Sequence, residues 1–259
     1  MNSKYLAAFL WPALAVYGQP SAEAVRQSYN QSFQDTAKVY AGAPNAFMVR
    51  MITGRKPGRA LDIGMGQGRN AIWLADQGWD VTGIDISDEG VSQARAEAKR
   101  RGVRLRAERI GYNEFDFGVE QWDLIVLCYF LPRELPAKLL LSLKPGGLVL
   151  IEGFHKDTGY RRLLFDGFAD NELPKLFSGY RTLQYEDADA DAEWGGALGS
   201  KKRVVRLLVE RPRAPRSSCS FEDREFARGQ TACWGPMQLR CEQNGWIRAG
   251  SCENSGKND

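Results

Sequence analysis

Three glycines and two acids lie close together between residues 60 and 87, and their types suit the binding of a nucleoside. Gly64, Gly66 and Gly68 follow an apolar run and remove side chains from a turn, so a ligand can approach the backbone closely. A helical pattern resumes directly after this turn, so the free N–H groups of a helix N-terminus point to the same place. Asp85 follows the next apolar run, where a carboxylate can accept both hydroxyls of a ribose. The pattern therefore predicts a nucleoside-cofactor site.

The choice of nucleoside depends on the second acid. Residues 66–71 satisfy the dinucleotide fingerprint G-x-G-x-x-A, so NAD is one interpretation. Asp62, however, stands within the end of the first strand, where its carboxylate repels a pyrophosphate and attracts an ammonium group. Gly64 already ends that strand, so a fingerprint that begins at Gly66 starts too late for the tight first turn. S-adenosylmethionine carries an ammonium, a sulfonium and a ribose but no phosphate, and it fits this set better.

The stretch LDIGMGQGRNAIWLADQGWDVTGIDIS, residues 61–87, resembles the class I S-adenosylmethionine-dependent methyltransferases. Arg69-Asn70, directly after the glycine turn, resembles the tellurite-resistance and thiopurine branch of small-molecule enzymes. The likeness covers roughly residues 45–212. It implies that Asp62 orients the cofactor's methionine amino group, that Asp85 holds the ribose and that Ile86 lies against the adenine. The whole cofactor-binding set that we predict is Asp62, Gly64, Met65, Gly66, Gly68, Asn70, Asp85, Ile86 and Gly111.

One position departs from the family pattern. After the third strand these enzymes usually carry an acid that binds the adenine amino group, and here Gly111 stands at about that place. Glu108 and Asn113 are the candidates to replace it. We therefore expect adenine binding to be altered or weaker.

Two further residues are catalytic candidates. Methyl transfer from a sulfonium is an in-line displacement, in which the protein mainly supplies positioning and desolvation. Tyr129 follows the predicted fourth strand, where it would touch the methyl-bearing sulfur or the acceptor. His155, the only histidine of the chain, follows the fifth strand and could deprotonate an acceptor near neutral pH. The alternative is a surface or capping histidine beside Lys156 and Asp157.

The elements that position these residues alternate along the chain. This alternation predicts an α/β fold with a doubly wound, mostly parallel Rossmann-like sheet and helices on both faces. Two consecutive strands near the end predict an antiparallel hairpin that closes a seven-stranded sheet, as the family resemblance implies. The expected strands cover 61–63, 79–84, 103–107, 122–129, 148–152, 180–186 and 204–210, and the expected helices cover 21–41, 45–52, 69–75, 87–101, 134–143 and 172–177, with a turn at 144–147 and a loop at 187–200.

The helices within residues 21–52 belong to the predicted methyltransferase domain, residues 19–210. In the related enzymes, such N-terminal helices cover the cofactor and shape the substrate pocket. Tyr29, Asn30, Tyr40 and Phe47 are candidates to line it, with ordinary packing as the alternative.

Both ends of the chain favour export. Residues 1–18 have the charged, apolar and small-residue order of a signal peptide, and the apolar run is too short for a comfortable membrane span. Beyond a linker at 211–218, residues 219–259 hold four cysteines in a segment too small for its own core, which predicts a module stapled by disulfides. A periplasmic or secreted protein follows, whose tail attaches to an envelope component. A cytoplasmic protein is the alternative, because S-adenosylmethionine is made in the cytoplasm.

The remaining composition limits the partners. A net charge of +3 with interspersed signs argues against nucleic acid. The cysteines form no CxxC pair, and the acidic segment 187–200 lacks the ligand ladder of a calcium loop, so we predict no metal site. The leading hypothesis is methyl transfer to a small molecule. The alternatives are a non-catalytic binding module on this scaffold in the cell envelope, and an NAD-dependent oxidoreductase, for which little chain is left to build a substrate domain.

Overall fold

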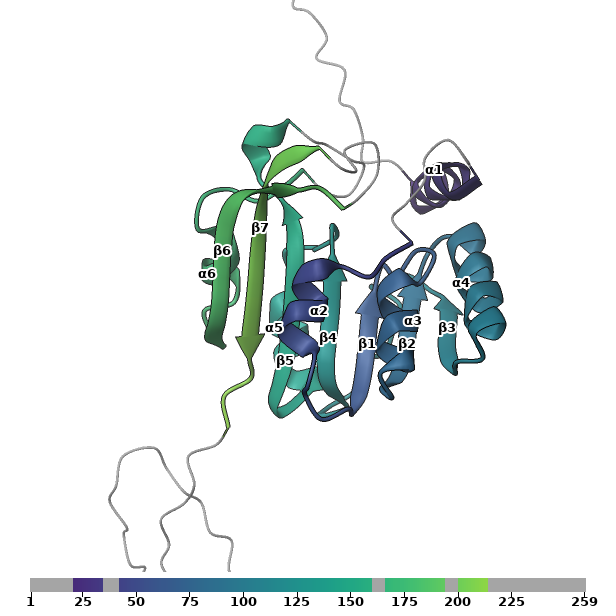
Figure 1. Cartoon of the computed structure of the whole chain (residues 1–259). Coiled ribbons are helices and arrows are strands. Elements are labelled where there is room, and N and C mark those ends of the chain that lie inside the picture. The colour runs from purple at the N-terminus through teal and green to yellow at the C-terminus, as the bar shows by residue number, and fades with distance from the viewer. Residues whose placement is uncertain (1–20, 35–41, 160–165, 194–199, 214–259) are drawn as a thin grey trace, which may run out of the picture. The chain divides into compact units, whose positions relative to one another are not determined.

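The computed structural model describes residues 21–34, 42–159, 166–193 and 200–213 (Figure 1). The predicted signal peptide, Tyr40, the linker beyond residue 213 and the cysteine-rich tail lie outside these ranges. Within them, no helix combines the length and the apolar character needed to cross a membrane.

A seven-stranded sheet in the order β3-β2-β1-β4-β5-β7-β6 forms the centre of the fold. The first five strands pair in parallel, and β7 runs antiparallel to both β5 and β6. This confirms the predicted Rossmann-like sheet with its closing hairpin. The strands are β1 (Arg59–Ile63), β2 (Asp80–Asp85), β3 (Leu105–Arg109), β4 (Trp122–Cys128), β5 (Leu143–Phe154), β6 (Arg181–Asp191) and β7 (Lys201–Glu210).

Helices cover both faces of this sheet, as the alternation predicts. In Figure 1, α2, α3 and α4 lie on the face turned toward the viewer, α5 and α6 lie behind the sheet, and α1 lies above its upper edge. The helices are α1 (Ala22–Gln34), α2 (Ala46–Ile52), α3 (Arg69–Asp76), α4 (Asp88–Arg101), α5 (Leu135–Ser142) and α6 (Glu172–Leu176), with a short 3-10 helix, η1 (Lys156–Thr158).

The central strand β4 explains the continuous apolar run in the sequence. Ile125 and Leu127 pack into the cluster that contains α5 and α6, whereas Leu124 and Val126 pack into the cluster that contains α2 and α3. All four side chains are fully buried. A strand buried on both faces needs apolar residues at every position, so its sequence does not alternate.

Capping residues fix the ends of two of the predicted helices. Ser87 caps α4 by accepting a hydrogen bond from the backbone N–H of Gly90 at 3.0 Å, and Gly102 ends that helix with a φ of 71°. Asn45 caps α2 by accepting from Met48 N at 2.9 Å. These caps fix the lengths of the elements on either side of the glycine turn.

The predicted loop at 187–200 is wrong in its first part. β6 continues to Asp191 and β7 begins at Lys201, so residues 187–191 are paired strand. Their acids lie opposite a basic run: Asp189 pairs with Arg203 and Asp191 with Lys201 in the register. Opposite charges across an antiparallel pair stabilise a sheet, which offsets the low strand propensity of the aspartates.

The predicted turn at residues 144–147 is also absorbed into a strand. β5 begins at Leu143, and the register with β4 shifts there, because Trp122 pairs with Leu143 whereas Leu124 pairs with Leu148. The extra residues form a bulge in which Gly146 has a φ of 84°. The Pro-Gly-Gly signal therefore marks a bulge at the start of the strand.

Gly68 is a position where only glycine fits. It is the N-cap of α3 with a φ of 79°, and a Cβ there would lie 2.9 Å from the Cβ of Ala94. We expect Gly68→Ala to lower the free energy of unfolding by about 2–3 kcal/mol, the sum of left-handed strain and overpacking. Gly54→Ala is the matched control, because Gly54 has a φ of 78° with open space around it, and it should cost only about 1 kcal/mol. Equal losses for the two variants in urea unfolding would contradict the packing argument.

Candidate functional site

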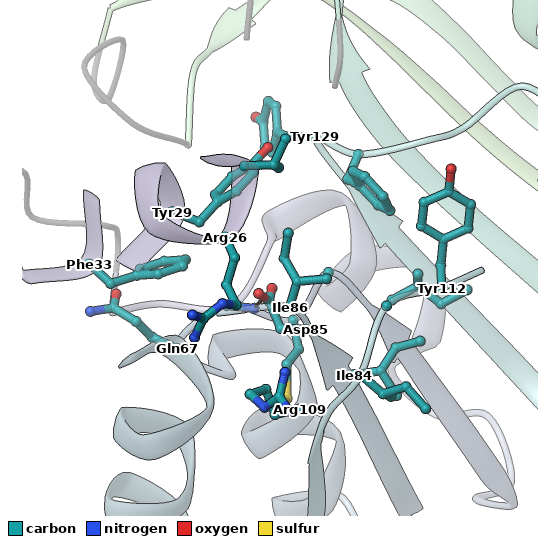
Figure 2. A pocket seen from close by; sticks show the side chains of 18 of the residues that line it. Arg26, Tyr29, Phe33, Gln67, Ile84, Asp85, Ile86, Arg109, Tyr112 and Tyr129 are labelled. Atoms are coloured by element: carbon teal, nitrogen blue, oxygen red, sulfur yellow. Dashed lines mark hydrogen bonds between the residues drawn. The ribbon is translucent and has the colours of Figure 1, made fainter. Parts of the chain in front are cut away.

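A cavity of about 490 Å³ lies where β1, β2 and β4 end at their carboxyl sides. It is lined by the glycine turn after β1, the end of β2, the segments after β3 and β4, and one face of α1. Figure 2 shows Arg26, Tyr29 and Phe33 of α1 above Asp85 and Ile86. Open parallel sheets bind ligands at this edge.

Most of the predicted cofactor residues meet at this cavity. Gly64, Met65, Gly66, Asn70, Asp85, Ile86, Gly111 and the catalytic candidate Tyr129 line it. Asp62, Gly68 and His155 are not among the lining residues.

Asp85 organises the glycine turn. Its Oδ2 accepts a hydrogen bond from Gly66 N at 2.9 Å, and its Oδ1 accepts from Ser87 N at 2.8 Å. Gly64 and Gly66 have φ values of 71° and 52°, and a Cβ at Gly66 would lie 2.9 Å from the ring of Phe33. Burial raises the pKa of Asp85, while these backbone N–H groups act in the opposite direction. The carboxylate is thus fixed at the cavity wall with lone pairs left for a ligand.

Asp62 lies beneath the turn. Its side chain is 2% exposed, and its Oδ2 accepts from Ala71 N at 3.1 Å in the first turn of α3. Burial raises the pKa of Asp62 to about 7, against the effect of Ala71 N and of the Arg69 guanidinium. In this geometry Asp62 tethers α3 to β1, and its predicted contact with the methionine amino group stays a prediction.

Of the two candidates to replace the missing acid after β3, only Asn113 lies at the cavity. Asn113 lines the cavity, and Glu108 is not among the lining residues. A Cβ at Gly111 would lie 2.6 Å from Asn113 Oδ1 and 3.5 Å from Ile86 Cγ2. Gly111 therefore leaves the room that the Asn113 amide fills beside Ile86.

Tyr129 stands in a strained conformation at the end of β4, with a φ of 59°. It is 5% exposed, and its hydroxyl donates to Glu152 Oε1 at 2.5 Å and accepts from Glu193 N at 3.3 Å. Burial and the Glu152 carboxylate raise the pKa of this phenol well above its usual value. The group stays neutral, and its hydroxyl serves as a tether to Glu152.

Helix α1 supplies site residues that the sequence analysis only partly identified. Tyr29 lines the cavity as predicted, and Arg26 and Phe33 do so as well. Arg26 pairs with Asp88 of α4, and Asn30 accepts a hydrogen bond from the Ser87 hydroxyl at 2.6 Å. The helical spacing of Arg26, Tyr29 and Phe33 was a signal that they share one face. Phe47 of α2, another candidate, is buried in the core and is not among the residues that line the cavity.

Arg69 gives the cavity an available cationic donor. Its Nη1 lies 3.2 Å from Ala43 O and 3.4 Å from Glu193 Oε2. Among the residues that the structure describes, its buried Nη2 has no hydrogen-bond partner. A buried guanidinium N–H without a partner at a ligand cavity suits an anionic group such as an amino-acid carboxylate. The described residues therefore fit S-adenosylmethionine at its ribose and at its methionine end.

Comparison with known proteins agrees with this geometry. A family model described as a methyltransferase domain matches residues 60–147. Hemagglutinin 1 of Eikenella corrodens is 31% identical over 167 residues, which is 60% of this chain and 55% of that protein. The probable S-adenosyl-L-methionine-dependent methyltransferase TehB of Haemophilus influenzae is 26% identical over 140 residues, 51% of this chain and 49% of that protein. The chain thus spans about half the length of these curated relatives.

Solved structures share the fold at low sequence identity. TehB of Haemophilus influenzae superposes with a TM-score of 0.53 at 20% identity, covering 72% of this chain and 67% of that one. The Burkholderia thailandensis 1,6-didemethyltoxoflavin-N1-methyltransferase, with bound 1,6-didemethyltoxoflavin and S-adenosylhomocysteine, gives 0.56 at 20% identity, covering 72% and 87%. The [4+2]-cyclase SpnF gives 0.59 at 19% identity, covering 75% and 97%.

The sheet order and the glycine turn with Asp85 agree with these matches. Residues 60–147 match a methyltransferase domain, and the chain is similar in sequence to a probable S-adenosyl-L-methionine-dependent methyltransferase, TehB. The solved structure of TehB shares the fold.

Proposed function

We propose that this protein binds S-adenosylmethionine in the cavity and transfers its methyl group to a small-molecule acceptor. The proposal is carried by three features that meet at one cavity: the Asp85 carboxylate, the glycine turn and the Arg69 Nη2 group, which has no hydrogen-bond partner among the described residues. The Asp85 carboxylate suits a ribose, and the glycine turn allows a ligand to approach the backbone closely. The Arg69 N–H suits a carboxylate of the ligand. The 1,6-didemethyltoxoflavin-N1-methyltransferase acts on a small molecule on the same fold, which supports this acceptor class.

Each lining residue has a role in this mechanism. S-adenosylmethionine, when bound, supplies the activated methyl group. Asp85 would accept from the ribose hydroxyls, Ile86 would lie against the adenine, and the Asn113 amide oxygen would accept from the adenine amino group. Helix α1 lines the cavity and would shield the bound cofactor from water, which would strengthen the polar contacts inside it. The neutral ring of Tyr129 forms part of the wall at the end of β4.

The second candidate is a binding module without methyl-transfer activity. The [4+2]-cyclase SpnF shares this fold, so the architecture alone does not establish methyl transfer. An intact Asp85 and Arg69 favour cofactor binding in either case.

Calorimetric titration of the full chain with S-adenosylmethionine, S-adenosylhomocysteine and NAD tests the proposal. We expect micromolar affinity for the first two and none for NAD. Release of S-adenosylhomocysteine during an acceptor screen then separates the enzyme from the binding module. Binding of NAD alone, or of none of the three, would contradict the cofactor assignment.

A proton balance tests the predicted role of Asp62. The folded pKa of about 7 lies above the ordinary value of 3.8, so the fold favours the neutral acid. The contribution of Asp62 to the stability of the folded state is therefore fully present below about pH 4 and is lost as the pH rises through about 7. An ammonium partner favours the ionised form, so binding at pH 6 should release about one proton from Asp62. Calorimetry in buffers of different ionisation enthalpy measures this release. Equal proton release by the wild type and Asp62→Asn would leave Asp62 as a tether only.

We further propose that the protein is exported. The support is the order of residues 1–18 and the four cysteines of the tail. Mass spectrometry of the chain expressed in a bacterium with a periplasm tests both, because cleavage near residue 18 and two disulfides are expected. An uncleaved, fully reduced chain would favour the cytoplasmic alternative.

A further inference from the structure

A second polar cluster lies outside the cavity lining, where β5 ends beside the β6–β7 hairpin. His155 follows β5, and its backbone N–H donates to Arg203 O of β7 at 3.0 Å. Asp157 of η1, Asp170 before α6 and Asp187 of β6 surround it. Three separate segments of the chain therefore bring charged groups to one place.

The His155 ring is held in a form that leaves one nitrogen available. Its side chain is 6% exposed, and Nδ1 lies 2.8 Å from Asp157 Oδ1. Nδ1 also accepts a hydrogen bond from the backbone N–H of Asp157 at 3.2 Å. Nε2 lies 3.3 Å from Asp170 Oδ1, and in the described part of the chain it has no hydrogen-bond partner. In the tautomer with its proton on Nδ1, toward the Asp157 carboxylate, the Nε2 lone pair faces Asp170 and is available to a cation.

Metal-binding histidines commonly show this arrangement. The imidazole donates one N–H to a carboxylate, which fixes the ring and presents the other nitrogen to the ion. His155 Nε2 and one oxygen each from Asp170 and Asp187 all lie within 4.8 Å of one another. Two ligand atoms at about 2.0–2.2 Å from one ion lie roughly 3–3.6 Å apart at octahedral or tetrahedral angles, so side-chain shifts of up to about 1–2 Å would bring the set onto an ion.

The charges of the cluster also favour a cation. Arg203 donates to Asp187 at 2.6 and 2.8 Å, to Asp170 at 2.7 Å and to Asp157 at 2.7 Å. Three carboxylates against one guanidinium leave an excess of negative charge around the His155 ring. Each carboxylate oxygen has two lone pairs, so Arg203 and a metal ion can share Asp170 and Asp187.

Tyr185 gives a second buried atom at the same place. Its buried hydroxyl oxygen has no hydrogen-bond partner among the described residues. Unpaired buried polar atoms often mark a missing water or ion.

We propose that His155, Asp170 and Asp187 bind a divalent first-row transition-metal ion such as Mn²⁺ or Zn²⁺, with Asp157 holding the imidazole through Nδ1. One imidazole nitrogen with two carboxylates suits these ions. The ion ties the end of β5 to the segment before α6 and to the hairpin. This site is independent of the cofactor cavity, and the sequence analysis, which expected no metal, did not identify it.

Mn²⁺ titration of the chelator-treated, oxidised full chain tests this site, with the free ion measured by electron paramagnetic resonance. Mn²⁺ is the probe because the tail cysteines could themselves bind Zn²⁺. We expect one ion per chain, with an affinity at least tenfold lower in His155→Asn and in Asp170→Asn. Asp166→Asn is the matched control, because Asp166 is exposed and pairs with Arg133 and Lys156 outside the cluster.

A thermal shift gives a second readout. Mn²⁺ should raise the unfolding temperature of the wild type and of Asp166→Asn and leave Asp170→Asn unchanged, because only a chain that binds the ion is stabilised by it. Asp170 is exposed, so its variant folds even if His155→Asn does not. No bound ion in the wild type, or equal binding in Asp170→Asn, would overturn the proposal and leave a network of ion pairs.

Discussion

Replacing Asp85 with Ala should lower the affinity for S-adenosylmethionine at least about 100-fold, with the fold intact. Two effects combine. The ribose hydroxyls lose their charged acceptor, and each hydrogen bond to a charged group contributes about 1.5–3 kcal/mol, or roughly 10- to 150-fold in affinity. Gly66 N and Ser87 N also lose their acceptors, so the turn that holds the cofactor is loosened. Calorimetric titration measures the first effect and circular dichroism checks the fold.

Asp85→Asn removes the charge of this side chain but keeps its size, so it separates the two effects on cofactor affinity. Both carboxylate oxygens accept from backbone N–H groups, so an amide of the same size satisfies only one of them and turns its NH₂ toward the other donor. We expect its affinity to fall almost as far as that of the alanine variant. Asp80→Asn is the control, because Asp80 is an exposed acid at the opposite end of β2. Unchanged affinity in Asp85→Ala would remove Asp85 from the cofactor site.

The sequence predicted this half of the site because its residues are close neighbours in the chain. A strand, a glycine turn and a helix fix where Gly64 and Gly66 lie, and the next parallel strand returns Asp85 to the same edge. The sheet order needed more than local patterns. The closing hairpin was predicted with help from the family resemblance, and the structure confirms it, whereas the reversal between β1 and β4 is seen only in the structure.

Contacts between residues that are far apart in the chain could not be predicted from local sequence patterns. Asn45, Glu152 and Arg206 belong to three distant segments, and no spacing in the sequence relates them. His155 shows the same limit: its position after β5 was predicted, whereas its ring is turned toward Asp157 and Asp170 and is not among the residues that line the cavity. The order of elements predicts which strand end a residue follows, but the direction of its side chain depends on partners that arrive later in the chain.

Replacing Glu152 with Ala should lower the free energy of unfolding by about 3–5 kcal/mol, the usual cost of removing one partner from a buried ion pair. Glu152 is fully buried. It accepts from Tyr129 Oη at 2.5 Å, from Asn45 Nδ2 at 2.7 Å and from Arg206 Nε at 2.6 Å. Within the described part of the chain, its removal leaves the Arg206 charge paired with Glu186 at 3.4 Å, and it takes away the Glu152 acceptor of the Tyr129 hydroxyl. Denaturant unfolding measures the loss.

Two further variants separate the effect of the Glu152 charge from the effect of its side-chain volume. In Glu152→Gln the remaining oxygen can still accept from Tyr129 and Asn45, while the NH₂ group faces Arg206 Nε, so the charge pair is lost without a cavity. A loss close to that of the alanine variant would assign the stability to the Arg206 pair. Glu186→Gln removes the more exposed partner of Arg206 and should cost only about 1 kcal/mol or less. If Glu152→Gln is as stable as the wild type, the buried charge contributes little. The strained Tyr129 backbone would then be held by packing against Phe154, whose ring centre lies 4.8 Å from that of Tyr129.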